Sequence, residues 1–158
     1  MKRIIPTITG LALAATIATA QEVAPLDVAF DEYGAVAVSL SGVAGNVDNG
    51  IVIMTDRGKG NCIACHQVTA LDEFPFHGEV GPSLDGVGSR WTEADLRGIV
   101  ANAKNTFPES VMPSFYKGTG YIRPGDAFTG KAGTEPLPPL LTAQEIEDVV
   151  AYLLTLTE

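Results

Sequence analysis

The chain has 158 residues, 19 of them acidic and 10 basic, which gives a formal net charge of −9. This length predicts a single domain. An acidic chain repels nucleic acid and anionic lipid, which argues against both as partners. The same charge either steers a partner with a basic patch or simply keeps the protein in solution.

The first twenty residues have the layout of a secretory signal peptide. Lys2 and Arg3 form a positive start, an apolar run extends from residue 11 to 18, and small residues precede the predicted cleavage before Gln21. The alternative is an uncleaved anchor, but the run is short of the roughly 20 residues that a membrane span needs. No other segment has that length. We therefore expect an exported protein, periplasmic in a bacterium, with eight basic and 19 acidic residues left after cleavage.

Residues 21–46 lack a helical period and are rich in small residues. They are predicted to form an extension that packs on the domain or on a partner. A short helix is predicted from Asp48 to about Arg57, with Val47, Ile51 and Met54 on one face. The predicted division of the chain is a signal peptide (1–20), an N-terminal extension (21–46) and a folded domain (47–158).

Both cysteines lie in the stretch GNCIACHQV, at Cys62 and Cys65, and His66 follows directly. In an exported protein this spacing permits a disulfide, a thioredoxin-like redox pair, half of a zinc site or a covalent haem. Zinc needs four ligands, and the chain adds only the distant His77; a redox pair expects a βαβ setting that the flanks do not provide. The fused Cys-x-x-Cys-His favours haem c, with two thioether bonds and His66 as the proximal iron ligand.

The second ring nitrogen of His66 should be held by a hydrogen-bond acceptor. The carbonyl of Pro82, in a Gly-Pro turn, is one candidate, although the turn is equally consistent with a purely structural role. Trp91 either donates its indole N–H to a haem propionate or packs at a helix start.

Three residues are candidates for the sixth iron ligand. Met112, in SVMPSFY, follows His66 by 46 residues, which lets the chain return on the far side of the haem. Met54 precedes the motif and is expected to be core, and His77 lies in a turn-rich loop and would make a bis-His site. Met112 is favoured, because proline stiffens its loop and can present the sulfur to the iron, and a neutral thioether favours reduced iron. The alternative is that Met112 fills a gap in the core. An open sixth position is the least favoured arrangement, because no distal acid–base residues cluster in the sequence.

Two further helices are predicted after the motif. The first begins with a capping box at Thr92 and Asp95, and the last with another at Thr142 and Glu145. Between them, residues 117–140 are rich in glycine and proline, which predicts a lid or a binding surface. The predicted fold is therefore a small all-α domain wrapped around one covalent haem. The apolar positions predicted to face its core are Leu96, Ile99, Val100, Ala103, Ile146, Val149, Val150, Leu153 and Leu154.

A helix before Cys-x-x-Cys-His, a Gly-Pro turn, a methionine loop and a last helix reading EIEDVVAYLLTL resemble class I cytochromes c. The segments GNCIACHQV, GEVGPSLDGVGSRWTEADLRGIVANAK and SVMPSFY are similar to those of the SoxX family, the small subunits of bacterial SoxAX cytochromes. The resemblance covers about residues 47–158, and Cys-x-x-Cys-His alone is common to all c-type cytochromes.

The resemblance implies a haem held by Cys62 and Cys65, with His66 proximal and Met112 distal. It also implies an electron-transfer subunit with no substrate site of its own, paired with SoxA, a second c-type cytochrome that holds the catalytic haem. The complex would join thiosulfate to a cysteine of the carrier protein SoxYZ, and electrons would leave to a small soluble cytochrome c. The chain has no cysteine beyond the haem motif to ligate such a catalytic haem.

Three other functions remain open from the sequence. A free-standing class I cytochrome c would need only a small exposed haem edge, whereas the extension and the long loop favour a docked subunit. A small haem peroxidase would need an open or displaceable sixth ligand. A thiol or zinc module would contain no haem.

Overall fold

The structure is a computed structural model, and it describes residues 21–126 and 129–158. The described part is all-α, as predicted: it contains no strand, only one isolated antiparallel bridge between Gly125 and Ala132. The predicted signal peptide lies outside the described residues. The helices, with η for 3-10 turns, are α1 (Val47–Thr55), η1 (Cys62–Ala64), η2 (Thr69–Leu71), α2 (Val87–Arg90), α3 (Glu93–Asn102), η3 (Ala103–Asn105) and α4 (Ala143–Thr155).

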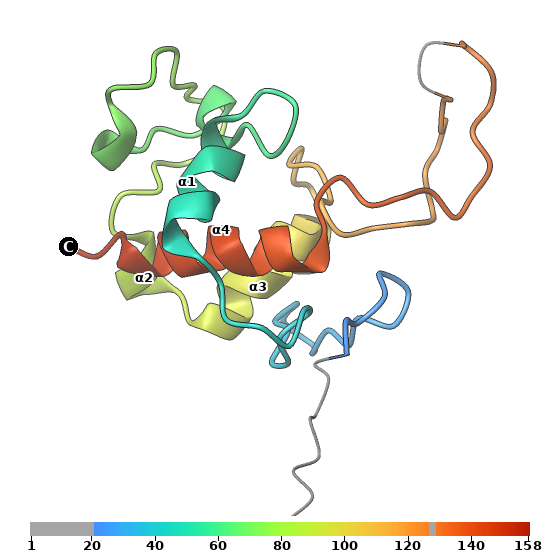
Figure 1. Ribbon diagram of the computed structural model, residues 1–158, viewed down its shortest axis with the longest axis horizontal. Coiled ribbons are helices and arrows are strands. Elements are labelled where there is room, and N and C mark those ends of the chain that lie inside the picture. Colours follow the sequence, from blue (N-terminus) through green and yellow to red (C-terminus); the bar gives the residue numbers. More distant parts are fainter. Residues whose placement is uncertain (1–20, 127–128) are drawn as a thin grey trace, which may run out of the picture.

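Helix α4 is the centre of the fold, and α1, α2 and α3 all pack against it (Figure 1). At the α1–α4 crossing a Cβ on Gly50 would lie 2.3 Å from the backbone oxygen of Asp148, so only glycine lets the two helices approach this closely. The core formed here is apolar, and its largest fully buried apolar side chains are Leu40, Met54, Val68, Leu71, Leu141, Ile146, Val149 and Val150.

Both predicted capping boxes are present. Thr92 accepts a hydrogen bond from the amide of Asp95, whose carboxylate accepts from the amide of Thr92, and Thr142 and Glu145 form the same reciprocal pair. The helix predicted at 48–57 is shorter, because Asp56 has an extended backbone that ends α1 at Thr55.

The predicted core face of α3 and the following η3 is largely correct, since Leu96, Val100 and Ala103 are buried, while Ile99 is half-buried. On α4, the residues Ile146, Val149, Val150 and Leu153 are buried and Leu154 is half-buried. The two helices also bury charged side chains that the apolar pattern did not predict.

A buried ion pair joins these charged side chains and fastens the N-terminal extension. Nε of Arg97 on α3 lies 2.9 Å from Oε1 of Glu147 on α4, and both side chains are almost fully buried. Nη1 of Arg97 donates to the carbonyl of Val36 at 2.8 Å, and the amide of Leu40 donates to Oε1 of Glu147 at 2.6 Å. Residues 36–40 therefore pack on the domain itself, and Val36 and Leu40 belong to its core.

Residues 117–126 and 129–138 form an arm that projects from the body on the right of Figure 1. Its two sides are joined by backbone hydrogen bonds from Leu137 to Gly118 and from Gly133 to Pro124, each 2.7 Å long. Near the base of the arm Glu135 accepts from the amides of Gly120 and Tyr121. The arm is thus held by its own hydrogen bonds.

In the part of the chain that the structure describes, none of the helices has the length and apolar character that crossing a membrane requires.

Candidate functional site

The haem motif forms one tight turn, separated from α1 by the loop at residues 56–61. The amides of Cys65 and His66 both donate to the carbonyl of Cys62, at 3.1 and 3.0 Å. The turn η1 therefore places the two thiols one turn apart, and neither forms a disulfide. Burial raises the pKa of the Cys62 thiol to about 12. A thioredoxin-like pair requires a lowered thiol pKa, so this environment argues against a redox dithiol.

The ring of His66 is fixed by the Gly-Pro turn sixteen residues further on. Its Nδ1 lies 2.7 Å from the carbonyl oxygen of Pro82, so Nδ1–H donates and Nε2 is left with its lone pair for a metal. Gly81 lies against the face of the same ring: a Cβ there would be 2.2 Å from Cε1 and 2.8 Å from Nε2 of His66. The amide of Gly81 donates to the carbonyl of Cys65 at 2.8 Å, which joins the turn to the motif.

The two alternative axial ligands are engaged elsewhere. His77 uses both ring nitrogens within its own loop: Nδ1 accepts from the amide of Val68 at 3.2 Å, and Nε2 donates to the carbonyl of Leu71 at 3.1 Å. Met54 is fully buried in the core. Neither side chain is therefore presented as a ligand.

The loop around Met112 is fastened to the end of α3. The amide of Met112 donates to Ser110 Oγ at 3.1 Å, and Lys104 Nζ donates to the carbonyl of Met112 at 2.9 Å. Further along, the amide of Tyr116 donates to the carbonyl of Ala101 at 3.0 Å. The Met112 side chain is half-buried and packs against the same core as Cys62 and Trp91.

Trp91 lies between α2 and α3. Its ring meets Phe107 edge to face, with centroids 6.0 Å apart. This contact supports the packing role for Trp91 that the sequence left open.

The structure therefore brings Cys62, Cys65, His66 and Pro82 together through direct contacts. The sequence did not predict the contact between Gly81 and the His66 ring or the fixation of His77. For the contact between Gly81 and the His66 ring, the sequence offered one indication: a glycine directly precedes Pro82, the predicted hydrogen-bond acceptor.

The donor set fits haem c and does not fit zinc. A covalent haem with a proximal histidine requires two free thiols and an imidazole with a free Nε2, and the structure provides them. Gly81 leaves the face of that imidazole clear of any side chain. Within residues 21–126 and 129–158 there is no group of three or more Cys, His, Asp or Glu side chains that could hold a metal ion.

The comparisons with known proteins agree with this geometry. The profile of the family described as "Cytochrome c" matches residues 47–157, so the chain belongs to the cytochrome c family. Its cofactor is one covalently bound haem c, and it is an electron-transfer protein.

Within that family the resemblance to SoxX subunits is confirmed. A chain of the crystal structure of SoxXA from P. pantotrophus is 59% identical, with a TM-score of 0.84, and the match covers 87% of this chain and 100% of that one. A ferric cytochrome c-550 from Paracoccus versutus matches at 23% identity over 72% of this chain and 99% of the other, and its TM-score of 0.38 adds nothing to the fold assignment. No curated protein matches in sequence.

Proposed function

We propose that this chain is the electron-transfer subunit of a periplasmic SoxAX-type cytochrome of thiosulfate oxidation. The observation that carries the proposal is the match at 59% identity over the whole of a SoxXA chain. The haem motif, with His66 held by Pro82, supplies the chemistry that this role requires.

Four residues are proposed to hold the cofactor. Cys62 and Cys65 would form the thioether bonds, and Nε2 of His66 and the sulfur of Met112 would be the proximal and distal iron ligands. When bound, the haem supplies an iron that gains and loses one electron. Pro82 and Gly81 keep the His66 ring in one orientation, and Ser110 and Lys104 hold the backbone of Met112 in place.

The proposed partner is a SoxA-like c-type cytochrome in a heterodimer, and electrons pass on to a small soluble cytochrome c. The carrier protein SoxYZ is reached only through the complex. The chain contains only two cysteines, both in the haem motif, so none remains to bind a persulfide or to ligate a catalytic haem. We therefore infer that the catalytic step occurs on the partner.

The predicted signal peptide at residues 1–20 supports a periplasmic location. The division into an extension at 21–46 and a cytochrome domain at 47–158 remains a prediction. The side chains of Val36 and Leu40 lie in the core of the domain, so this part of the extension packs with it.

The experiment is mild purification of the native protein from the periplasm, followed by haem staining and identification of what elutes with it. A second c-type cytochrome with a cysteine-ligated haem, present in equal amount, supports the proposed role. Elution alone as a red, low-spin monomer would instead indicate a free-standing carrier.

A further inference from the structure

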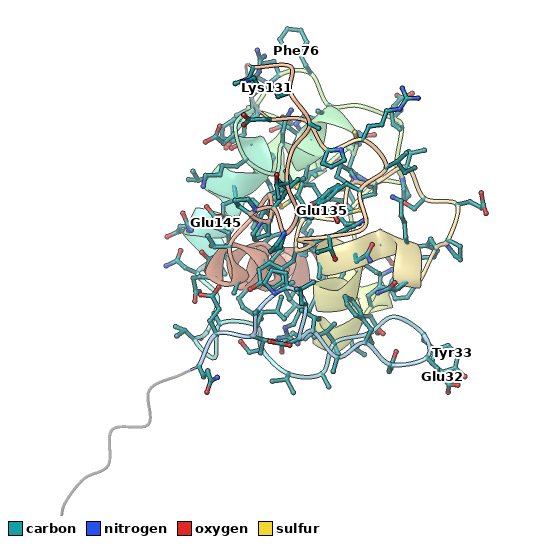
Figure 2. All side chains as sticks on the ribbon, turned by 90° about the vertical axis from the view of Figure 1, so that its right-hand side faces the viewer. Glu32, Tyr33, Phe76, Lys131, Glu135 and Glu145 are labelled. Carbon is teal, nitrogen blue, oxygen red and sulfur yellow. The ribbon has the colours of Figure 1, made fainter. Side chains whose placement is uncertain are left out.

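The loop that follows the haem motif holds an aromatic side chain in water. Phe76 is 81% exposed, and its φ of +72° is a left-handed conformation that bulky residues rarely adopt. Figure 2 shows Phe76 at the top of the molecule, projecting away from the body. An unfavourable backbone conformation therefore coincides with an exposed apolar side chain.

This loop is fixed to the haem motif. His77 holds it from within through Val68 and Leu71, as described above. The amide of Gly78 donates to the carbonyl of Ile63 inside the motif at 2.8 Å, and a Cβ on Gly78 would lie 2.1 Å from the backbone oxygen of Ala64. Phe76 is thus held at a set position beside the residues that bind the haem.

The sequence on either side of Phe76 is acidic. Between Lys59 and Arg90 the sequence has no lysine or arginine and four carboxylates, at positions 72, 73, 79 and 85. Asp72 and Glu79 are exposed, and together with Phe76 they line one open hollow of about 520 Å³. We call these three residues the Phe76 patch.

We propose that the Phe76 patch is the docking surface for the electron acceptor, a c-type cytochrome whose own surface presents an apolar spot ringed by lysine or arginine. The inference rests on the proposed function and names the surface that the acceptor uses. One electron leaves the reduced iron of this chain and reduces the ferric iron of the acceptor, and no bond forms or breaks.

The composition of the patch favours a transient acceptor over a permanent subunit. A permanent interface buries on the order of 2,000 Å² or more and is rich in apolar residues, whereas weak redox encounters bury under about 1,200 Å². One aromatic anchor within an acidic surround fits the second class, because aromatic residues carry binding energy and opposite charge speeds the encounter. The occupant is therefore a basic protein that binds and leaves.

The test uses variants of the full haem-loaded protein with matched controls. Phe76→Asn removes the ring, and asparagine tolerates the left-handed backbone. Its control is Tyr33→Ala, because Tyr33 is 72% exposed and lies at the opposite end of the molecule in Figure 2. The double variant Asp72→Asn/Glu79→Gln removes charge from the patch, and Glu32→Gln removes charge beside Tyr33.

The first measurement is the Kd for ferric mitochondrial cytochrome c, which serves as a basic c-type probe. The probe is titrated into the oxidised protein, so that no electron transfer accompanies binding. Phe76→Asn should raise Kd about tenfold, as expected for loss of an aromatic anchor. The double charge variant should raise Kd at low salt and flatten its salt dependence. Both control variants should bind like the unchanged protein, and oxidation by ferricyanide, a small anion that needs no docking, should be the same for Phe76→Asn.

Three results would overturn the proposal. The first is that the unchanged protein does not bind the basic probe even at low salt. The second is that Tyr33→Ala and Phe76→Asn weaken binding equally. The third is that Phe76→Asn releases the SoxA-like subunit, which would make the patch a subunit interface. Failure to purify with a SoxA-like partner would count against the proposed function alone, because the Kd comparison needs no such partner.

Discussion

Replacing Gly81 by alanine tests whether the face of His66 must be free of any side chain. The added Cβ would lie 2.2 Å from Cε1, 2.6 Å from Nδ1 and 2.8 Å from Nε2 of the ring, all below the 3.4 Å at which ordinary contact begins. The ring would have to retreat by about 1 Å to restore that contact. It cannot do so and keep the 2.7 Å hydrogen bond from Nδ1 to Pro82.

The free-energy cost has two parts. Overpacking of a filled site costs about 1–3 kcal/mol, and loss of one hydrogen bond costs about 1 kcal/mol. We therefore expect Gly81→Ala to lower the free energy of unfolding by about 2–4 kcal/mol. Displacement of the proximal ring should also convert part of the oxidised haem from low to high spin, since the geometry of Nε2 relative to the iron would change.

The assay combines denaturant unfolding with the absorption spectrum of the oxidised, haem-loaded protein. The matched control is Gly58→Ala, because a Cβ at Gly58 would meet only the Oδ1 of Asp56, at 3.4 Å. If Gly81→Ala unfolded like Gly58→Ala and kept the spectrum of the unchanged protein, the close approach of Gly81 to His66 would be wrong.

Three other predictions follow from the same structure. Met112→Ala should leave the haem attached and lower its reduction potential, because a thioether favours reduced iron; redox titration measures this, and an unchanged potential would remove Met112 as the ligand. Glu147→Ala leaves the buried Arg97 with only the exposed carboxylate of Glu93 as an ion-pair partner and should cost about 3 kcal/mol in denaturant unfolding, the low end for breaking a buried pair, whereas a cost under about 1 kcal/mol would contradict the buried pair. Hydrogen bonds from the hydroxyl and amide of Thr69 hold the pKa of Asp85 below its ordinary value, so this contribution to stability is present above the unfolded-state pKa and is lost as pH falls through the folded-state pKa. The stability deficit of Asp85→Asn should therefore shrink in acid, and a deficit that stays constant with pH would contradict the assignment.

The parts of the fold set by local sequence could be predicted. The capping boxes at Thr92 and Thr142 each involve residues only three positions apart, so a short stretch contains the whole signal. The apolar faces of α3 and α4 follow from helical periodicity in the same way. The burial of Arg97 and Glu147 could not be predicted, because charged residues are normally exposed and their partners come from three separate segments.

The same division applies to the site. The haem motif is contiguous, so its residues could be named from the sequence, and their roles as ligands remain predictions. The fixation of the His66 ring by Pro82 was one of two alternatives, and the structure shows the contact. The close approach of Gly81 and the left-handed backbone of Phe76 depend on how two loops meet in space, and no short-range pattern reports either.

The contacts of the extension also bear on where a folding unit begins. The family match starts at residue 47, yet the backbones of Val36 and Leu40 bind the buried Arg97 and Glu147 from outside that range. A recombinant fragment starting at residue 47 would remove the Val36 carbonyl and expose the ion pair to water on one side. The smallest autonomous unit of this cytochrome is therefore expected to be longer than the region its family shares.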